Sequence, residues 1–249
     1  MQQLNIGENI IWLNEVESTN THIAFLAQKN AAEGVVVAAK FQTEGKGQRG
    51  NVWESQSGMN LTFSVLLHPS FLPVKNQFLI SKITALAICD TLDLLVGNTS
   101  IKWPNDIYVG DNKISGILIE NSFSSHLMDV SIIGIGLNVN QKTFSDDIPN
   151  PTSLHILTQR LFKLDNLLKK LCSALSSRYH QLKCNNIEAI SNDYFCKLYR
   201  KDSYYTYMAN DVTFRAKIFG VRDSGELLLK TDSDEVREFC FKEVSFVSE

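Results

Sequence analysis

The sequence has no uninterrupted apolar run of the roughly 18 residues that a membrane-spanning helix needs. Its most apolar long stretch, residues 80–96, is interrupted by Lys82, Asp90 and Asp93. The start of the chain also lacks the basic and then apolar pattern of a secretion signal. We therefore expect a cytoplasmic protein that does not bind membranes.

Cysteine and histidine pairs at metal-ligand spacing are missing as well. The five cysteines are scattered, and no two of them form a C-x-x-C motif. An odd, dispersed set of cysteines favours thiols kept reduced inside the cell. The five histidines are equally dispersed. We therefore expect no metal site built by the protein alone.

The chain has no excess of positive charge. Its 249 residues include 24 Lys and Arg against 27 Asp and Glu, which gives a formal net charge of −3. Because nucleic-acid binding proteins usually carry a strongly basic surface, a general nucleic-acid binder is not expected. The length is sufficient for one large domain and one small domain.

Apolar periodicity predicts an α/β body followed by a small β module. Apolar and β-branched runs predict strands at residues 10–16, 35–41, 60–68, 101–103, 107–109, 113–121 and 129–138. Helical spacing predicts helices that begin near residue 20 and that span residues 77–96, 165–182 and 187–198. Short alternating runs at 212–219, 226–230 and 238–247 predict the strands of the module.

A long segment rich in glycine and charge, residues 42–58, interrupts this pattern and offers only Val52 and Trp53 for burial. Its glycines allow close approach of backbone N–H groups to an anion, and its cations add positive charge. These residues are Gly45, Gly47, Gly50, Lys46 and Arg49. The P-loop pattern is absent. On composition alone, a flexible loop and an anion-binding loop are both open.

Three further polar segments have two interpretations each. Residues 102–106, Lys-Trp-Pro-Asn-Asp, end a strand where α/β sheets hold ligands, but spacing alone slightly favours a surface turn with a buried Trp. The glycines of residues 134–140, Gly-Ile-Gly-Leu-Asn-Val-Asn, permit close approach of a ligand, but a β-bulge or tight packing explains them about as well. Residues 18–20, Ser-Thr-Asn, are typical of a helix cap, although one cap cannot use all three side chains.

Taken together and in order, these motifs resemble those of the bacterial biotin protein ligases, also called biotin–[acetyl-CoA-carboxylase] ligases. The resemblance extends from residue 16 to residue 249 and includes Gln-x-x-Gly-Lys-Gly-Gln-Arg-Gly-x-x-Trp at 42–53 and Lys-Ile-Ser-Gly-Ile-Leu-Ile-Glu at 113–120. It implies an α+β fold, with a mixed sheet flanked by helices as in class II synthetases. It also implies a catalytic domain at residues 1–200 and an SH3-like β-barrel module at 201–249.

The resemblance implies a two-step reaction. Biotin and ATP form biotinyl-5′-AMP and pyrophosphate, and a lysine of a biotin carboxyl carrier protein then displaces AMP. Because a carboxylate must approach a phosphate in the first step, cations and inward N–H groups are required. Mg²⁺ is expected with the triphosphate. Homodimers occur among such enzymes, so a homodimer is left open.

The resemblance also assigns residues to roles. Biotin contacts are expected from Ser18, Thr19, Asn20, Gln42, Gly45, Lys46, Gly47, Gln48, Lys113 and Gly116. Nucleotide contacts are expected from Gly45, Lys46, Gly47, Gln48, Arg49, Trp53, Lys102, Asn105 and Asn138. The expected catalytic residues are Lys113, Asp106, Lys46 and Arg49. Lys113 would stabilise charge at the biotin carboxylate and α-phosphate, and Asp106 would orient the incoming lysine and accept its proton.

Two features depart from the common pattern of the family. Many members have Gly-Arg-Gly-Arg where this chain has Gly-Lys-Gly-Gln at residues 45–48, so that Lys46 and Gln48 replace the two arginines. Lysine keeps the charge but loses the bidentate fork of arginine, whereas Gln48 loses the charge, so we expect faster escape of the adenylate unless Arg49 compensates. Only 17 residues precede Ser18, fewer than the roughly 50 of a domain, so no DNA-binding domain is expected.

Two alternatives are weighed, an enzyme of the same superfamily and a protein of a different functional class. A lipoate or octanoate ligase or transferase shares the core fold, but its pocket must accept a flexible apolar chain. The polar set of Ser18, Thr19, Asn20 and Gln42 favours biotin instead. A non-catalytic biotin-binding module would not need Lys113, Asp106 and a cationic loop together.

Overall fold

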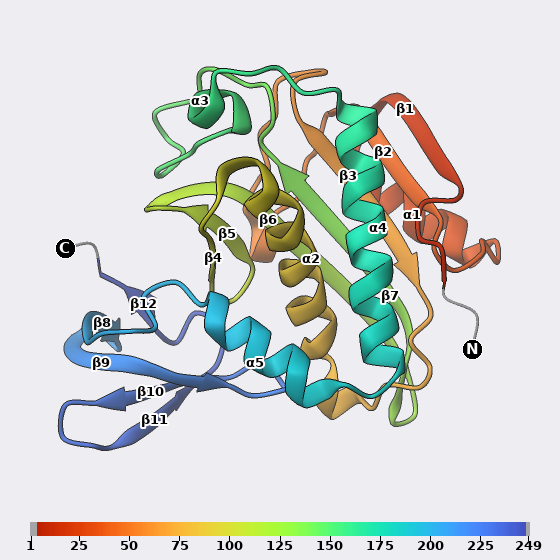
Figure 1. Cartoon of the computed structure of the whole chain (residues 1–249). Helices are drawn as coiled ribbons and strands as arrows, with labels where there is room; N and C mark the ends of the chain where they lie inside the picture. The colour runs from red at the N-terminus through yellow and green to blue at the C-terminus, as the bar shows by residue number, and fades with distance from the viewer. Residues whose placement is uncertain (1–3, 248–249) are drawn as a thin grey trace.

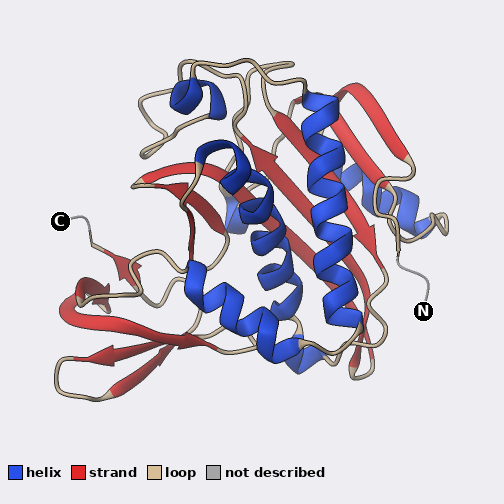
Figure 2. Cartoon of the chain, in the orientation of Figure 1, coloured by secondary structure: helices blue, strands red, loops and turns tan. Residues whose placement is uncertain are grey.

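The structure is a computed structural model that describes residues 4–247, apart from the side chain of Arg49. The described chain forms two sheets, a seven-stranded one and a five-stranded one. Helices flank the larger sheet, and the smaller sheet lies beside one end of the helical layer (Figure 1). Figure 2 separates the two kinds of element by colour. The α+β fold class predicted from the sequence is confirmed.

The larger sheet is mixed. Its strands lie in the order β1-β2-β3-β7-β6-β5-β4. β1 and β2 are parallel, and the other neighbouring strands are antiparallel. Their bounds are Ile10–Val16 (β1), Val36–Gln42 (β2), Leu61–Leu67 (β3), Thr99–Lys102 (β4), Asp106–Val109 (β5), Asn112–Ser124 (β6) and Leu127–Leu137 (β7).

This sheet is covered on both faces because successive side chains of a strand point to opposite sides. In β2, Val36 and Ala38 join one apolar core, while Val37 joins another. The described α-helices span Thr19–Gln28 (α1), Phe78–Val96 (α2), Leu154–Thr158 (α3), Leu164–Lys183 (α4) and Ile187–Lys197 (α5). None of the described helices combines the length and apolar character that crossing a bilayer requires.

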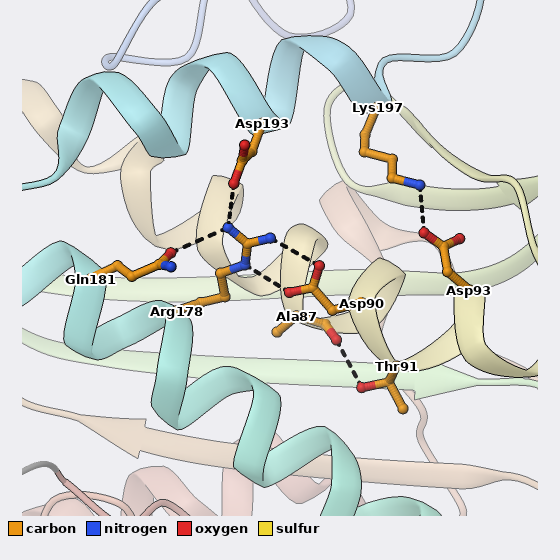
Figure 3. Close-up of polar contacts among 8 residues, drawn as sticks. All are labelled: Ala87, Asp90, Thr91, Asp93, Arg178, Gln181, Asp193 and Lys197. Carbon is orange, nitrogen blue, oxygen red and sulfur yellow. Dashed lines mark hydrogen bonds and ion pairs between the residues drawn. The ribbon is translucent and has the colours of Figure 1, made fainter.

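One arginine connects three helices (Figure 3). Arg178 of α4 donates to both carboxylate oxygens of Asp90 in α2, at 2.7 and 2.9 Å, and to Asp193 of α5 at 2.6 Å. Nearby, Lys197 of α5 lies 2.5 Å from the carboxylate of Asp93 in α2. These bonds hold α5 against α2, and α5 leads directly to the second sheet.

The second sheet is antiparallel, with the order β11-β10-β9-β8-β12. Its strands span Tyr205–Ala209 (β8), Val212–Val221 (β9), Leu227–Thr231 (β10), Val236–Phe239 (β11) and Ser245–Phe246 (β12). The expected β-barrel is not closed among the described residues, because the short strand β12 pairs with β8 and not with β11. The division into domains at residues 200 and 201 stays a prediction.

The second sheet is attached to the body through buried contacts. The ammonium of Lys82 in α2, only 1% exposed, lies 2.6 Å from Asp223. Trp103, which follows β4, donates its indole N–H to the backbone oxygen of Gly225 at 2.9 Å. Because one partly buried ion pair and one buried hydrogen bond act at neighbouring points, the position of this sheet against the body is well defined.

Candidate active site

A cleft of about 800 Å³, its open mouth included, lies where the start of α1, the glycine-rich loop and strands β5, β6 and β7 meet. Its wall near α1 is formed by Ser18, Thr19, Asn20 and Gln42. The loop contributes Lys46, Gly47, Gln48 and Trp53. The sheet contributes Asn105, Asp106, Lys113 and Gly116. Residues that the sequence analysis selected from distant segments thus share one cleft.

The α1 wall is a preformed polar surface. Thr19 donates its backbone N–H and its hydroxyl to Oε1 of Gln42, at 2.7 and 3.1 Å. This orients the Gln42 amide and leaves its Nε2 hydrogens available to a ligand. Ser18 precedes α1, but its side chain makes no capping hydrogen bond, so the simple helix-cap interpretation does not hold for this hydroxyl.

Asn20 is fixed by three residues of the sheet. Its Nδ2 donates to Glu120 at 2.7 Å, and its Oδ1 lies 2.6 Å from the hydroxyl of Ser64. A Cβ on Gly134 would lie 2.4 Å from Oδ1, so only glycine leaves room for this amide. Since protein groups use both polar ends of Asn20, its direct contact with biotin stays a prediction.

The glycine-rich loop forms a compact hairpin. Lys46 pairs with Val52 in an antiparallel bridge, and the N–H of Trp53 donates to Gly45 at 2.9 Å. The Lys46 ammonium donates to the hydroxyl of Thr21 in α1 at 2.9 Å. The hairpin thereby holds one cation at the cleft. The side chain of Arg49, also expected here, lies outside the described residues.

Trp53 extends from this hairpin onto the sheet. A Cβ on Gly136 would come within 2.2 Å of Trp53 Cε2, and one on Gly116 within 3.1 Å of Cζ3. The tight-packing explanation of the β7 glycines is therefore confirmed, because the groups that approach Gly134 and Gly136 are the side chains of Asn20 and Trp53. The indole Nε1 is buried and has no hydrogen-bond partner among the described residues.

Lys113 and Asp106 form an ion pair inside the cleft, with 2.7 Å between Nζ and Oδ1. Their side chains are 28% and 21% exposed, so a ligand can reach both. The backbone of Lys113 is held on both sides, since its N–H donates to Asn150 and its carbonyl accepts from Thr152. The expected catalytic lysine is thus anchored in β6 and directed at the expected base.

Two asparagines expected to contact the nucleotide from the sheet have different surroundings. Asn105 lines the cleft and donates to the carbonyl of Ile117 at 2.8 Å. Asn138 lines an adjoining hollow of about 1060 Å³ that shares Trp53 and Lys113 with the cleft. Its Nδ2 donates to Thr152 at 3.0 Å, while its buried Oδ1 has no partner among the described residues. That oxygen can accept a hydrogen bond from a ligand.

Lys102 is not brought to this cleft. It lines a separate hollow, and its ammonium lies 3.2 Å from the hydroxyl of Tyr108 and 5.5 Å from the centroid of Phe246. Burial lowers the pKa of Lys102 below its ordinary value. Its expected role in nucleotide binding stays a prediction.

The sequence analysis gave no role to three residues near the site. Glu120 and Ser64 orient Asn20 from strands that are distant in the sequence. Lys242, from the segment between β11 and β12, lines the cleft across from the body. No motif surrounds Lys242, and only the docking of the second sheet brings it here.

The cleft does not offer a metal cage. Within the described residues, no group of three or more His, Cys, Asp and Glu side chains is placed to hold a metal ion. Asp106 is the carboxylate among the cleft residues, and it is paired with Lys113. These groups fit a Mg²⁺ ion that arrives on a triphosphate, held largely by phosphate oxygens and water.

Residues 12–138 match the family model described as "Biotin/lipoate A/B protein ligase family". The "Bifunctional ligase/repressor BirA" of Bacillus spizizenii is 30% identical over 239 residues, which cover 91% of this chain and 70% of that protein. The "Biotin--[acetyl-CoA-carboxylase] ligase" of Paracoccus denitrificans is 27% identical, covering 88% and 92% respectively. The biotin protein ligase from Aquifex aeolicus, solved with biotin and ATP, superposes with a TM-score of 0.81 at 28% identity over 97% of this chain and 100% of that one.

Proposed function

Because the chain belongs to the biotin/lipoate A/B protein ligase family, we propose that this cleft is where it joins biotin to ATP and then to a carrier protein. The protein is a biotin–protein ligase that forms biotinyl-5′-AMP and transfers biotin to a lysine. The observation that carries the proposed site is the convergence of Lys46, Lys113 and Asp106 with a polar wall in one cleft.

In the first step, a carboxylate oxygen of biotin attacks the α-phosphorus of ATP. A carbon–oxygen–phosphorus anhydride forms, the bond between the α-phosphorus and the bridging oxygen breaks, and pyrophosphate leaves with the electron pair. Both reactants are anions, so Lys113 and Lys46 lower their mutual repulsion in a cleft that is partly shielded from water. Mg²⁺ enters as part of the nucleotide substrate.

The polar wall gives the cleft its preference for biotin. The ureido ring of biotin offers both donors and an acceptor, and the Ser18 hydroxyl and the oriented Gln42 amide offer complementary groups. A pocket with fixed polar groups rejects a ligand that leaves them unpaired. Lipoate and octanoate carry only an apolar chain to this wall, so the geometry favours biotin.

We place the adenosine in the adjoining hollow beside Trp53, with the free Oδ1 of Asn138 accepting from the nucleotide. This hollow and the cleft share Trp53 and Lys113, so a bound ATP would present its α-phosphate at Lys113. Trp53 and Lys113 would also contact the mixed anhydride after pyrophosphate leaves.

In the second step, the amine of a carrier lysine attacks the carbonyl of biotinyl-AMP and AMP leaves. Asp106 accepts the proton of the amine. The partner is a biotin carboxyl carrier protein. A homodimer would use an open edge of the larger sheet, β1 or β4. Cytoplasmic location and the lack of a DNA partner stay predictions.

One experiment separates the ligase from its relatives. Pyrophosphate release from ATP is measured with biotin, lipoate or octanoate as the only acid. We expect release with biotin and release near background with the other two acids. Release that is stronger with lipoate would overturn the assignment of biotin as the substrate. No release with any of the three acids would overturn the proposal that the protein is a ligase.

A further inference from the structure

We infer that Glu120 fixes the direction of the hydrogen bonds in the polar wall of the cleft and thereby sets how tightly that wall binds biotin. The inference rests on the proposed function of the cleft and deepens it. Glu120 is a positioning residue, because it acts on the ligand through Asn20 and Ser64 and not by direct contact.

Glu120 lies outside the cleft. Among the described residues, Asn20 lines both the cleft and an open hollow between α1 and strands β6 and β7, whereas Glu120 lines only the hollow. The hydrogen bond from Asn20 Nδ2 to the Glu120 carboxylate, at 2.7 Å, joins the two spaces. Apart from the long-range effect of its charge, Glu120 therefore influences a ligand in the cleft through Asn20.

The carboxylate decides which way the Asn20 amide faces. An ionised carboxylate only accepts hydrogen bonds, and an amide oxygen also only accepts. The end of the amide that faces Glu120 must therefore be the NH₂ group, and Oδ1 must face Ser64, 2.6 Å away. Because Asn20 and Ser64 are 4% and 0% exposed, bulk water does not offer either side chain another partner.

The orientation of Asn20 in turn uses the hydrogen of Ser64. Oγ of Ser64 lies 2.6 Å from Asn20 Oδ1 and 2.7 Å from Thr19 Oγ1, but a hydroxyl carries only one hydrogen. Since Oδ1 can only accept, the Ser64 hydrogen goes to Asn20, and the hydrogen between the two hydroxyls comes from Thr19. The Thr19 hydrogen is then shared between Ser64 and the Gln42 oxygen, which lies 3.1 Å away. The chain of donors thus runs from Thr19 toward Glu120.

This direction suits the ureido ring of biotin. Thr19 lines the cleft, and because its hydrogen is held inside the wall, its oxygen can accept from a ureido N–H. The Gln42 oxygen is held by the backbone N–H of Thr19 at 2.7 Å, which leaves the amide hydrogens of Gln42 for the ureido carbonyl. A donor in place of Glu120 would turn the Asn20 amide around, and Ser64 would then donate to Thr19. The Thr19 hydrogen would be free to turn into the cleft against the ureido N–H, so biotin would bind less tightly.

The test changes which groups position 120 offers to Asn20. Glu120→Gln keeps an acceptor oxygen, whereas Glu120→Lys offers only donors. Asp129→Lys is the matched control, because Asp129 is an exposed residue of the same hollow and receives the same change in charge. Biotin affinity is measured by calorimetry on the full chain. KM for biotin, KM for ATP and kcat are measured in pyrophosphate release with carrier protein, and urea unfolding gives the stability of each variant.

We expect Glu120→Lys to weaken biotin binding and to raise KM for biotin about tenfold, while KM for ATP and kcat stay within about twofold of wild type. Glu120→Gln should stay within about threefold in every parameter, because its oxygen can still accept from Asn20. Asp129→Lys should bind biotin within about twofold of wild type. If Glu120→Lys behaved like Asp129→Lys, or if it lowered kcat and raised both KM values equally, the inference would be overturned.

A second substitution distinguishes the direction of the hydrogen bonds from simple damage to the wall. In the Glu120→Lys background, Asn20→Asp supplies acceptor oxygens both to the new ammonium and to the Ser64 hydroxyl, so biotin affinity should recover severalfold. Asn20→Asp alone places two carboxylates together and should weaken binding. The absence of any recovery in the double variant would overturn the inference. A wild type that bound biotin but released no pyrophosphate would refute the proposed reaction, while calorimetry would still decide the role of Glu120.

Discussion

The Lys113 ammonium lies 2.7 Å from Oδ1 of Asp106 inside the cleft. The two side chains project from neighbouring antiparallel strands, where Asp106 is opposite Gly116. We propose that an anion that takes the Lys113 charge frees the Asp106 carboxylate to accept a proton. This exchange of partners would link binding of the adenylate to activation of the second nucleophile.

Asp106→Asn tests this link. The substitution keeps the size of the side chain but removes the base, so transfer from biotinyl-AMP to the carrier lysine should slow by about 100-fold. Adenylation does not need the base and should change by less than about threefold. The two half-reactions are measured separately by carrier biotinylation and by pyrophosphate release. Equal losses in both would contradict the assignment of Asp106 to the second step.

Gly136→Ala tests whether Trp53 needs its place on the sheet. The new Cβ would come within 2.2 Å of the indole, which should cost about 1–3 kcal/mol of unfolding free energy and displace the hairpin that carries Lys46. Biotin-dependent pyrophosphate release should fall with it. Urea unfolding measures the first effect.

Gly220→Ala is the control for that substitution, because a Cβ there meets only Leu228 at 3.8 Å. We expect this variant to change the unfolding free energy by less than about 0.5 kcal/mol. If Gly136→Ala were as active and as stable as Gly220→Ala, the contact between Trp53 and the sheet would have no functional weight.

Local patterns account for most of what the sequence predicts. The helix expected at residues 77–96 is Phe78–Val96, and the one expected at 187–198 is Ile187–Lys197. A long repeat of apolar residues at helical spacing predicts a helix from the local sequence alone. The helix Leu154–Thr158 is too short to show a period. Strand Tyr205–Ala209 was not among the predicted strands, although its Tyr205 and Tyr207 alternate with Thr206.

Non-local contacts account for what the sequence leaves open at the site. The order of the motifs predicted that segments 18–20, 42–53 and 113–116 contribute to one site, since each segment has its own sequence signal. Residues of all three segments line the cleft. Ser64 and Lys242 carry no such signal, and their positions at the site follow from strand pairing and from the docking of the second sheet. Lys102 shows the converse, because its motif is present while its side chain lies in another hollow.

Asp93→Asn tests the pH dependence of stability. Burial raises the pKa of Asp93, but hydrogen bonds from Lys197 and Thr99 outweigh this, so its pKa lies below the ordinary value of 3.8. The unfolded state therefore binds the proton more readily, and the stabilisation is present at neutral pH and lost as pH falls through the lowered pKa. Asp93→Asn should cost about 1 kcal/mol at pH 7.

The cost of that substitution should disappear when the wild-type carboxyl is also protonated, well below its ordinary pKa. Urea unfolding at a series of pH values from neutral to acidic measures the difference between the two proteins. Asp234→Asn is the control, since its ion pair with Lys230 is on the surface, where such pairs contribute little. A cost that did not change with pH would show that packing, and not charge, makes Asp93 important.

Gln48→Arg tests how well the cleft retains its intermediate. Gln48 lines the cleft in the hairpin, where many biotin protein ligases have arginine. A guanidinium at this position would donate charge-assisted hydrogen bonds to the adenylate phosphate, so escape of biotinyl-AMP should slow by about tenfold. Labelled adenylate formed on the enzyme and chased with excess unlabelled adenylate gives the release rate directly.

Gln56→Arg adds the same charge at an exposed position on the same segment and should leave the release rate unchanged. A rate that Gln48→Arg does not slow would mean that the charge missing at position 48 does not control retention, because other cations of the cleft already hold the phosphate.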